Sequence, residues 1–204
     1  FNMKSQVFKN IGLAIFLLIS PNIFGQNTSV EEIFNRYFEA VASKDTILSI
    51  KSIHAVSEAK LNGYTLILNT KLLYPNKKSI RARVDSLNIS EFLFDGKNAW
   101  VKNKNGTRII EGLELENLKS ESTPFLELNA NETSILKGIE KLRERNVYVV
   151  QISQNSFAYY DCYSGLKLRY VNLKKTKDSV FTQTIDYRDY KSIQGIKYPH
   201  EMEI

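Results

Sequence analysis

The sequence is poor in the residues that build metal, redox and disulfide sites. Its 204 residues include one cysteine and two histidines. The lone Cys162 cannot form an intrachain disulfide, and its place in an aromatic stretch favours an inert thiol over a nucleophile. His54 and His200 lack the closely spaced partners that a zinc site needs, which predicts surface or strand-end histidines. We therefore expect no metal and no cofactor.

Catalytic motifs are also missing. The chain has no Gly-x-Ser-x-Gly elbow, Walker loop, Gly-x-Gly-x-x-Gly turn or His-Glu-x-x-His pair. The nearest approach to a serine nucleophile, Tyr163-Ser164-Gly165, is typical of a turn. We expect a protein that is not an enzyme. A hydrolase built on carboxylates from distant strands stays open as a weaker hypothesis.

The longest hydrophobic run is short as well. It covers the nine residues 11–19, far fewer than the roughly 20 that cross a bilayer as a helix. Two lysines stand before it, a Ser-Pro-Asn break follows it, and Gly25 offers a small residue at a cleavage site. This order predicts a cleaved secretory signal peptide over residues 1–25 and a mature domain over residues 26–204, with an uncleaved membrane anchor as the alternative.

Cleavage at this point has consequences for location and charge. Gln26 stands where a bacterial lipoprotein would carry its lipid on a cysteine, so we expect release into the periplasm without a lipid anchor. Loss of Lys4 and Lys9 lowers the formal net charge from +6 to +4. The aromatic residues alternate with polar ones as core strand positions do, so we expect no nucleic-acid partner. The remaining charge is compatible with contact with anionic membrane surfaces.

The mature chain predicts one α+β domain, because 43% of the residues are hydrophobic and no linker or repeat divides it. A capping-box pattern at Thr28–Glu31 and apolar residues at helical spacing predict a helix to about Ala42. Asp45 can cap a second short helix that ends at Ile50. Between residues 111 and 145 the apolar residues are spaced for short helices or a long covering segment.

Strands are expected in the remainder. Apolar and polar residues alternate within residues 65–74 and 80–85, and Asn-Gly, Asp-Gly, Ser-Gly and Gln-Gly pairs between such runs are typical of hairpin turns. Later strands are expected at residues 147–152, 157–162, 166–173, 180–187 and from 196 to the end. A meander of about ten strands with one apolar face has to curl. We therefore expect a curled antiparallel sheet, a half-open β-barrel, with helices covering its concave face.

Several motifs follow one another in an order that resembles a known family. They are Tyr74-Pro75-Asn76, the alternating strand 80–84, residues 92–97 with Trp100, and Thr123-Pro124-Phe125-Leu126. The downstream segments 161–166, 186–188 and 195–199 are similar to a branch found in Bacteroidetes-type bacteria. Together the motifs resemble the outer-membrane lipoprotein-sorting family, the LolA-like periplasmic carriers, over essentially all of residues 28–204.

That resemblance implies a soluble periplasmic carrier that shelters acyl chains of lipoproteins or lipids in an apolar cavity for transfer to the outer membrane. Six residues would form this ligand-binding cavity: Ile80, Ala82, Val84, Phe92, Phe94 and Phe125. The resemblance places Phe125 on a lid helix, while Phe94 is added because strand alternation gives it the same face as Phe92. We expect a monomer in transient contact with the inner- and outer-membrane lipoprotein machinery.

The chain departs from the known carriers at one position. They place an arginine just before the Pro-Asn turn, where it helps to hold the lid closed, and this chain has Tyr74 there. A fold of this kind can also serve a different role. The alternative hypothesis is a non-enzymatic envelope sensor or adaptor that binds a protein partner through the same sheet. Gln26 favours a mobile carrier over a membrane-anchored acceptor.

Overall fold

The computed structural model describes residues 28–204 apart from 62, 121–124, 131–132 and 176–179. The expected signal peptide over residues 1–25 lies outside the described residues, and so does Gln26. Within the described part of the chain, no helix combines the length and the apolar character needed to cross a membrane.

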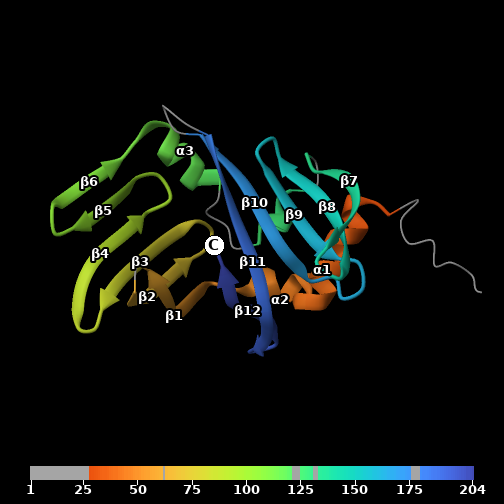
Figure 1. Ribbon diagram of the computed structural model, residues 1–204, viewed down its shortest axis with the longest axis horizontal. Helices are drawn as coiled ribbons and strands as arrows, with labels where there is room; N and C mark the ends of the chain where they lie inside the picture. The colour runs from red at the N-terminus through yellow and green to blue at the C-terminus, as the bar shows by residue number, and fades with distance from the viewer. Residues whose placement is uncertain (1–27, 62, 121–124, 131–132, 176–179) are drawn as a thin grey trace, which may run out of the picture.

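Two six-stranded antiparallel sheets form the body of the molecule (Figure 1). The first sheet contains β1 (Ser52–Leu61), β2 (Tyr64–Leu73), β3 (Lys77–Val84), β4 (Leu87–Phe94), β5 (Ala99–Asn103) and β6 (Gly106–Ile110). The second sheet contains β7 (Ile135–Leu142), β8 (Arg145–Ser153), β9 (Ser156–Asp161), β10 (Lys167–Lys175), β11 (Val180–Ile193) and β12 (Ile196–Glu203). Each is a simple meander, because every strand pairs with its neighbour in the sequence.

The two sheets correct the expectation of one curled sheet that approaches a barrel. The strand order in the described residues has β6 at the edge of the first sheet and β7 at the edge of the second, and the sheets are not closed into a barrel. The chain between these edges forms the helix α3 (Gly112–Ser120) and the short 3-10 helix η1 (Leu126–Leu128). An intervening segment of this kind interrupts the hairpin connectivity that a continuous meander needs.

The region 111–145 is therefore only partly helical. Ile135, Leu136 and Ile139 have helical spacing but lie in β7, paired with β8. Ile135 and Ile139 are largely exposed, while Leu136 packs against the core. The backbone ladder with β8 overrides the local spacing, which a short apolar run cannot by itself assign to helix or strand.

Two helices precede the first sheet, as expected, but their caps differ from the prediction. The N-cap of helix α1 (Val30–Val41) is Ser29. The Ser29 hydroxyl accepts a hydrogen bond from the Glu32 backbone N–H, and the Glu32 carboxylate accepts one from the Ser29 backbone N–H. The capping box is thus one residue later than predicted. The helix α2 (Lys44–Ser49) is capped by Ser43 and not by Asp45. Serine is a strong N-cap residue in both places.

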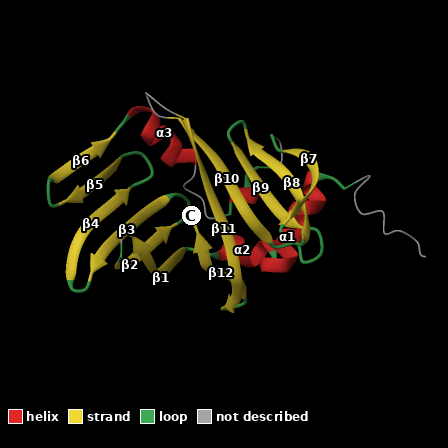
Figure 2. Ribbon diagram, viewed as in Figure 1, coloured by secondary structure: helices red, strands yellow, loops and turns green. Residues whose placement is uncertain are grey.

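The main core lies between α1 and the second sheet. Its centre is Tyr160 of β9, which contacts Phe34 and Tyr37 of α1 with ring centroids 5.8 and 5.6 Å apart. Tyr148 and Val150 of β8 complete the buried layer. Figure 2 shows that strands dominate the molecule and that α1 and α2 lie at the second sheet, whereas α3 lies between the sheets. The larger cluster of buried residues therefore lies at the second sheet, and only a small one lies at the first.

The turn between β9 and β10 approaches the backbone of α1 closely. Arg36 of α1 donates a hydrogen bond of 2.5 Å to the carbonyl oxygen of Cys162 in this turn. Gly165 has φ +73°, and a Cβ atom there would lie 2.7 Å from the carbonyl oxygen of Arg36. Glycine is required at this position both for its backbone conformation and for the contact.

We predict that Gly165→Ala destabilises the protein more than Gly195→Ala. Gly195 has φ +81° but open space around it, so alanine there costs only the roughly 1–2 kcal/mol of a left-handed backbone. At Gly165 the collision with α1 adds about 1–3 kcal/mol. Urea titrations followed by circular dichroism give both free energies of unfolding. Equal losses would mean that α1 moves away from the turn without cost.

Candidate ligand-binding face

Five of the six predicted cavity residues lie on one face of the first sheet. Ile80 of β3 pairs with Phe92 of β4, so their side chains are neighbours on that face. Ala82, Val84 and Phe94 share it by strand alternation. On β2 the face continues through Leu66, Leu68 and Leu72, which pair with Val84, Ala82 and Lys78. The alternation expected from the sequence is present in the structure.

This apolar face has a covered end and an uncovered part. Phe94, Ala99 and Ile110 form a small buried cluster against which Leu115 and Leu118 of α3 pack. Farther along β3, Ile80 and Val84 are only half-buried and belong to neither core cluster. Phe94 is thus a packing residue under α3. Ile80, Val84, Leu68 and the half-buried Phe92, which also packs against the small cluster, form what we call the apolar strip.

Phe125, the sixth predicted residue, lies elsewhere. It is buried in the core of the second sheet, and its ring centroid is 6.4 Å from that of Tyr198 in β12. It immediately precedes η1 and does not lie within a helix. The structure therefore brings five predicted residues together and separates the sixth from them.

A buried charged cluster next to Phe125 was not expected from the sequence. Glu127 of η1 is 1% exposed, and its Oε1 accepts bonds of 2.7 Å from the Lys167 ammonium and from the Tyr160 hydroxyl. Lys167, 6% exposed, also lies over the rings of Tyr37 and Tyr187. Oε2 of Glu127 has no hydrogen-bond partner among the described residues. The cluster fastens the segment that carries Phe125 to the second sheet.

Electrostatics favour the charged form of Lys167 and the neutral form of Tyr160 in this cluster. Burial alone would lower the pKa of Lys167, but attraction to the Glu127 carboxylate and nearby tyrosines outweighs burial and raises it. Burial raises the pKa of Tyr160 well above 10.0, and the negative charge of Glu127 adds to the effect. Tyr160 therefore remains a hydrogen-bond donor at neutral pH. Its hydroxyl and the lysine together stabilise one buried carboxylate.

A sequence signal for the pair did exist. Glu127 stands between Leu126 and Leu128, and Lys167 stands between Leu166 and Leu168. A single charge inside each of two apolar segments, with opposite signs, is the pattern of a buried ion pair. What the sequence could not supply is that η1 and β10 meet.

Tyr74 does not replace the arginine of the known carriers. It packs against the main core, and its buried hydroxyl has no hydrogen-bond partner among the described residues. Burial raises the pKa of Tyr74 to about 12, and nearby Tyr198 adds to the rise. An uncharged hydroxyl of this kind cannot form the charged latch of an arginine. In this chain the Glu127–Lys167 pair is the charged contact that holds the segment around Phe125.

The described residues contain no group of three His, Cys, Asp or Glu side chains that could hold a metal ion. Cys162 is buried, and burial raises the pKa of its thiol. A thiol of this kind is a poor nucleophile at neutral pH.

We predict that Glu127→Leu lowers the free energy of unfolding by about 3–5 kcal/mol, because it leaves the Lys167 ammonium buried without its counter-charge. The matched control is Glu114→Leu, which removes a 2.8 Å pair with Arg108 at an exposed site. Exposed pairs contribute about 1 kcal/mol or less. Urea titration measures both.

The double variant Glu127→Leu with Lys167→Met should recover much of the loss, because apolar residues can replace a buried ion pair. A loss for Glu127→Leu no larger than for Glu114→Leu would show that the buried pair has no special role in holding η1.

No family model matches the chain, and no curated protein sequence matches it. Among solved structures, it is similar to a LolA superfamily protein from Nitrosomonas europaea. The similarity has a TM-score of 0.52, covers 86% of this chain and 84% of the other, and comes with 12% sequence identity. At this identity the likeness concerns the fold, and the Bacteroidetes-type branch stays a prediction. The chain has a LolA-like fold.

Proposed function

We propose that this protein is a periplasmic carrier that binds acyl chains of lipoproteins or lipids on the apolar face of the first sheet. The observation that carries the proposal is the apolar strip itself. Leu68, Ile80, Val84 and Phe92 lie side by side on three paired strands and are only half-buried in a LolA-like fold. An apolar surface that packing covers only in part can bind an acyl chain and remove it from water.

Binding an acyl chain requires an apolar surface that excludes water, and it requires no catalytic group. Each CH₂ group taken out of water contributes about 0.8 kcal/mol, so the affinity for a chain grows with the length of strip that it covers. The strip crosses β2, β3 and β4. In the carrier, α3 and the segment around Phe125 would shelter the bound chain, so that the curled sheet acts as a half-open barrel.

Location and partners belong to the same proposal. The carrier would be exported by the signal peptide over residues 1–25 and would work as a monomer without a lipid anchor. It would meet the inner- and outer-membrane lipoprotein machinery transiently. A non-enzymatic role fits a strip that contains no nucleophile or titratable side chain.

Native mass spectrometry of protein purified from the periplasm without detergent tests the proposal. We expect a bound species whose mass matches an acylated ligand, and we expect the stripped protein to bind a fluorescent fatty-acid probe. An empty protein that also fails to bind the probe would overturn the carrier role. Capture of one envelope protein regardless of its acylation, without probe binding, would favour the adaptor.

We predict that Ile80→Asp weakens binding of the fatty-acid probe by about tenfold or more, because a carboxylate on the strip must be desolvated by the chain. The control is Arg81→Asp, one residue along β3 but on the opposite face, with a side chain that is 52% exposed. It should leave probe binding unchanged. Thermal unfolding checks that both variants are folded. Equal losses of probe binding in the two variants would contradict the assignment of the acyl chain to the face that carries Ile80.

A further inference from the structure

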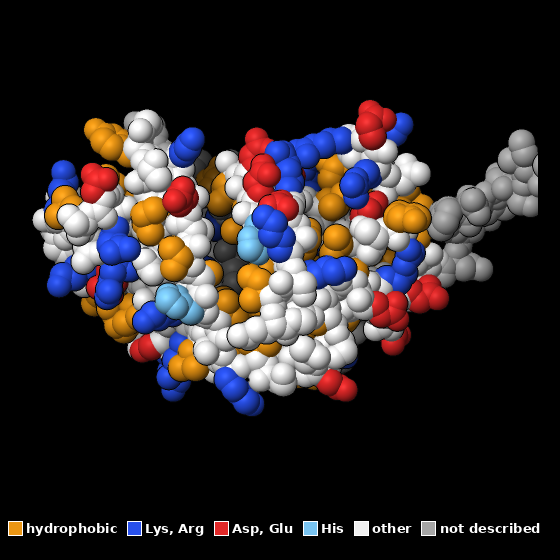
Figure 3. Space-filling view, turned by 90° about the horizontal axis from the view of Figure 1, so that it is seen from below, with side chains coloured by type: hydrophobic (Ala, Val, Ile, Leu, Met, Phe, Trp, Pro, Cys, Tyr) orange, Lys and Arg blue, Asp and Glu red, His pale blue; other side chains and the backbone are white. Residues whose placement is uncertain are grey.

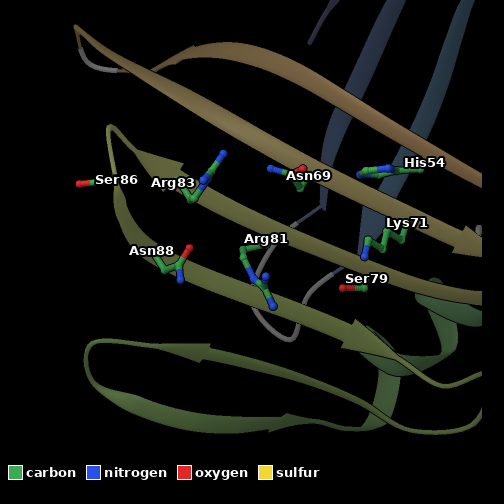
Figure 4. Close-up of a pocket in the computed structure, with 8 residues that line it drawn as sticks. All are labelled: His54, Asn69, Lys71, Ser79, Arg81, Arg83, Ser86 and Asn88. Carbon is green, nitrogen blue, oxygen red and sulfur yellow. The ribbon is translucent and has the colours of Figure 1, made fainter.

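The face of the first sheet opposite the apolar strip carries a basic hollow. Arg81 and Arg83 alternate with the apolar residues of β3 and therefore lie on this opposite face. The hollow has a volume of about 360 Å³, within the range of small-molecule sites. The residues that line it all have polar or charged side chains: His54, Asn69, Lys71, Ser79, Arg81, Arg83, Ser86 and Asn88 (Figure 4).

The strand register explains why these side chains meet. His54 of β1 pairs with Lys71 of β2, which pairs with Ser79 of β3. In the next row Asn69 pairs with Arg81, and beyond it Arg83 pairs with Asn88. Residues that pair across strands have their Cβ atoms about 5 Å apart. The hollow is therefore a set of adjacent rows on one side of a hydrogen-bonded sheet.

The positive charges of the hollow are poorly balanced. Glu91 pairs with Arg81 at 2.8 Å, but no carboxylate lines the hollow. Within the described part of the chain, Lys71 and Arg83 take part in no ion pair, and the buried Nε of Arg83 lacks a hydrogen-bond partner. Like charges on one sheet face destabilise each other. A bound anion would offset that repulsion and supply the missing acceptor.

The neutral residues suit a phosphate group. Asn69 and Asn88 carry amide N–H donors, and Ser79 and Ser86 carry hydroxyl donors around the cations. A phosphate oxygen accepts bonds from such donors, and the arginine fork binds two phosphate oxygens at once. Figure 3 shows lysine and arginine side chains over the part of the surface formed by the first sheet, which would attract anions toward it.

A second hollow of about 420 Å³ adjoins the basic one. It shares His54, Lys71 and Ser79 with the basic hollow. Its other lining residues include the apolar Leu73 and Leu93 and the charged Lys77, Lys78 and Asp95. A phosphate in the basic hollow could therefore be attached to an apolar body that occupies the second.

We propose that the basic hollow is a phosphate-binding site, with Lys71 and Arg83 as the charged partners of a phosphate group on a soluble molecule or on a lipid. It lies on the face opposite the acyl strip and does not depend on the carrier role. The two sources share the same chemistry at the site, and experiments can separate them.

The first experiment measures binding of wild-type protein to two probes. Calorimetry with inorganic pyrophosphate tests the soluble source, and flotation with phosphatidylcholine vesicles, with or without phosphatidylglycerol, tests the lipid source. Binding of pyrophosphate alone assigns the site to soluble phosphates, and binding of the anionic vesicles alone assigns it to a lipid. Binding of both, with pyrophosphate releasing the vesicles, shows that the phosphate group itself is recognised.

The second experiment compares matched variants. Lys71→Gln with Arg83→Gln should weaken binding of the active probe by about tenfold or more, since it removes two charge-assisted contacts. Lys60→Gln with Lys102→Gln removes the same charge from the same sheet face outside both hollows and should change binding by less than about twofold. Lys71→Gln alone, at an exposed side chain, tests the site if the Arg83 substitution impairs folding.

Three outcomes would overturn the site. They are failure of the wild-type protein to bind either probe, equal losses in both double variants, and tighter binding of a single-stranded RNA than of either phosphate source. Fatty-acid probe binding should be unchanged in the Lys71 and Arg83 variant. Failure of the phosphate site and failure of the carrier role are therefore separate results.

Discussion

Side chains along a β-strand point alternately to the two faces of a sheet, and in β3 the two sets have opposite chemistry. Ile80 and Val84 face one way, while Arg81 and Arg83 face the other. A register slip of one residue in β3 would exchange the faces, so both proposed sites depend on the same pairing.

The turn after β4 helps to define where that strand ends. Asp95 accepts hydrogen bonds of 2.8 Å from two backbone N–H groups, and these bonds hold the pKa of its carboxyl below the usual value.

Most of the hydrophobic core lies at the second sheet, which explains why part of the apolar face of the first sheet is only half-buried. The second sheet packs against α1 through Tyr160 and its neighbours, and this layer forms the larger core. The buried pair between Glu127 and Lys167 adds a charged contact that ties η1 to the same sheet. With the main core provided there, the first sheet needs only the small cluster around Phe94 to pack α3. Ile80 and Val84 belong to neither core cluster and are only half-buried.

The sequence predicts local features well because alternation and turn residues act over a few positions. The strands from β8 to β12, the Gln194-Gly195 turn and the shared face of Ile80 and Phe92 all follow from such patterns. Contacts between distant segments are the features that could not be predicted. Neither the burial of Phe125 in the second sheet nor the meeting of Glu127 with Lys167 is encoded by local spacing. The split into two sheets likewise depends on how the chain after β6 packs.

Strand register also explains why the sequence alone does not reveal the basic hollow. In the sequence, Arg81 and Arg83 alternate with apolar residues, and this pattern indicates only the solvent-exposed face of a half-buried strand. Their significance comes from Lys71 and His54, which the pairing of β1, β2 and β3 places beside them. The two faces then differ in the force that would hold a ligand. Charge attraction in the basic hollow weakens as salt screens it, whereas apolar burial on the strip does not. Higher ionic strength would therefore weaken binding in the basic hollow and would not weaken binding on the strip.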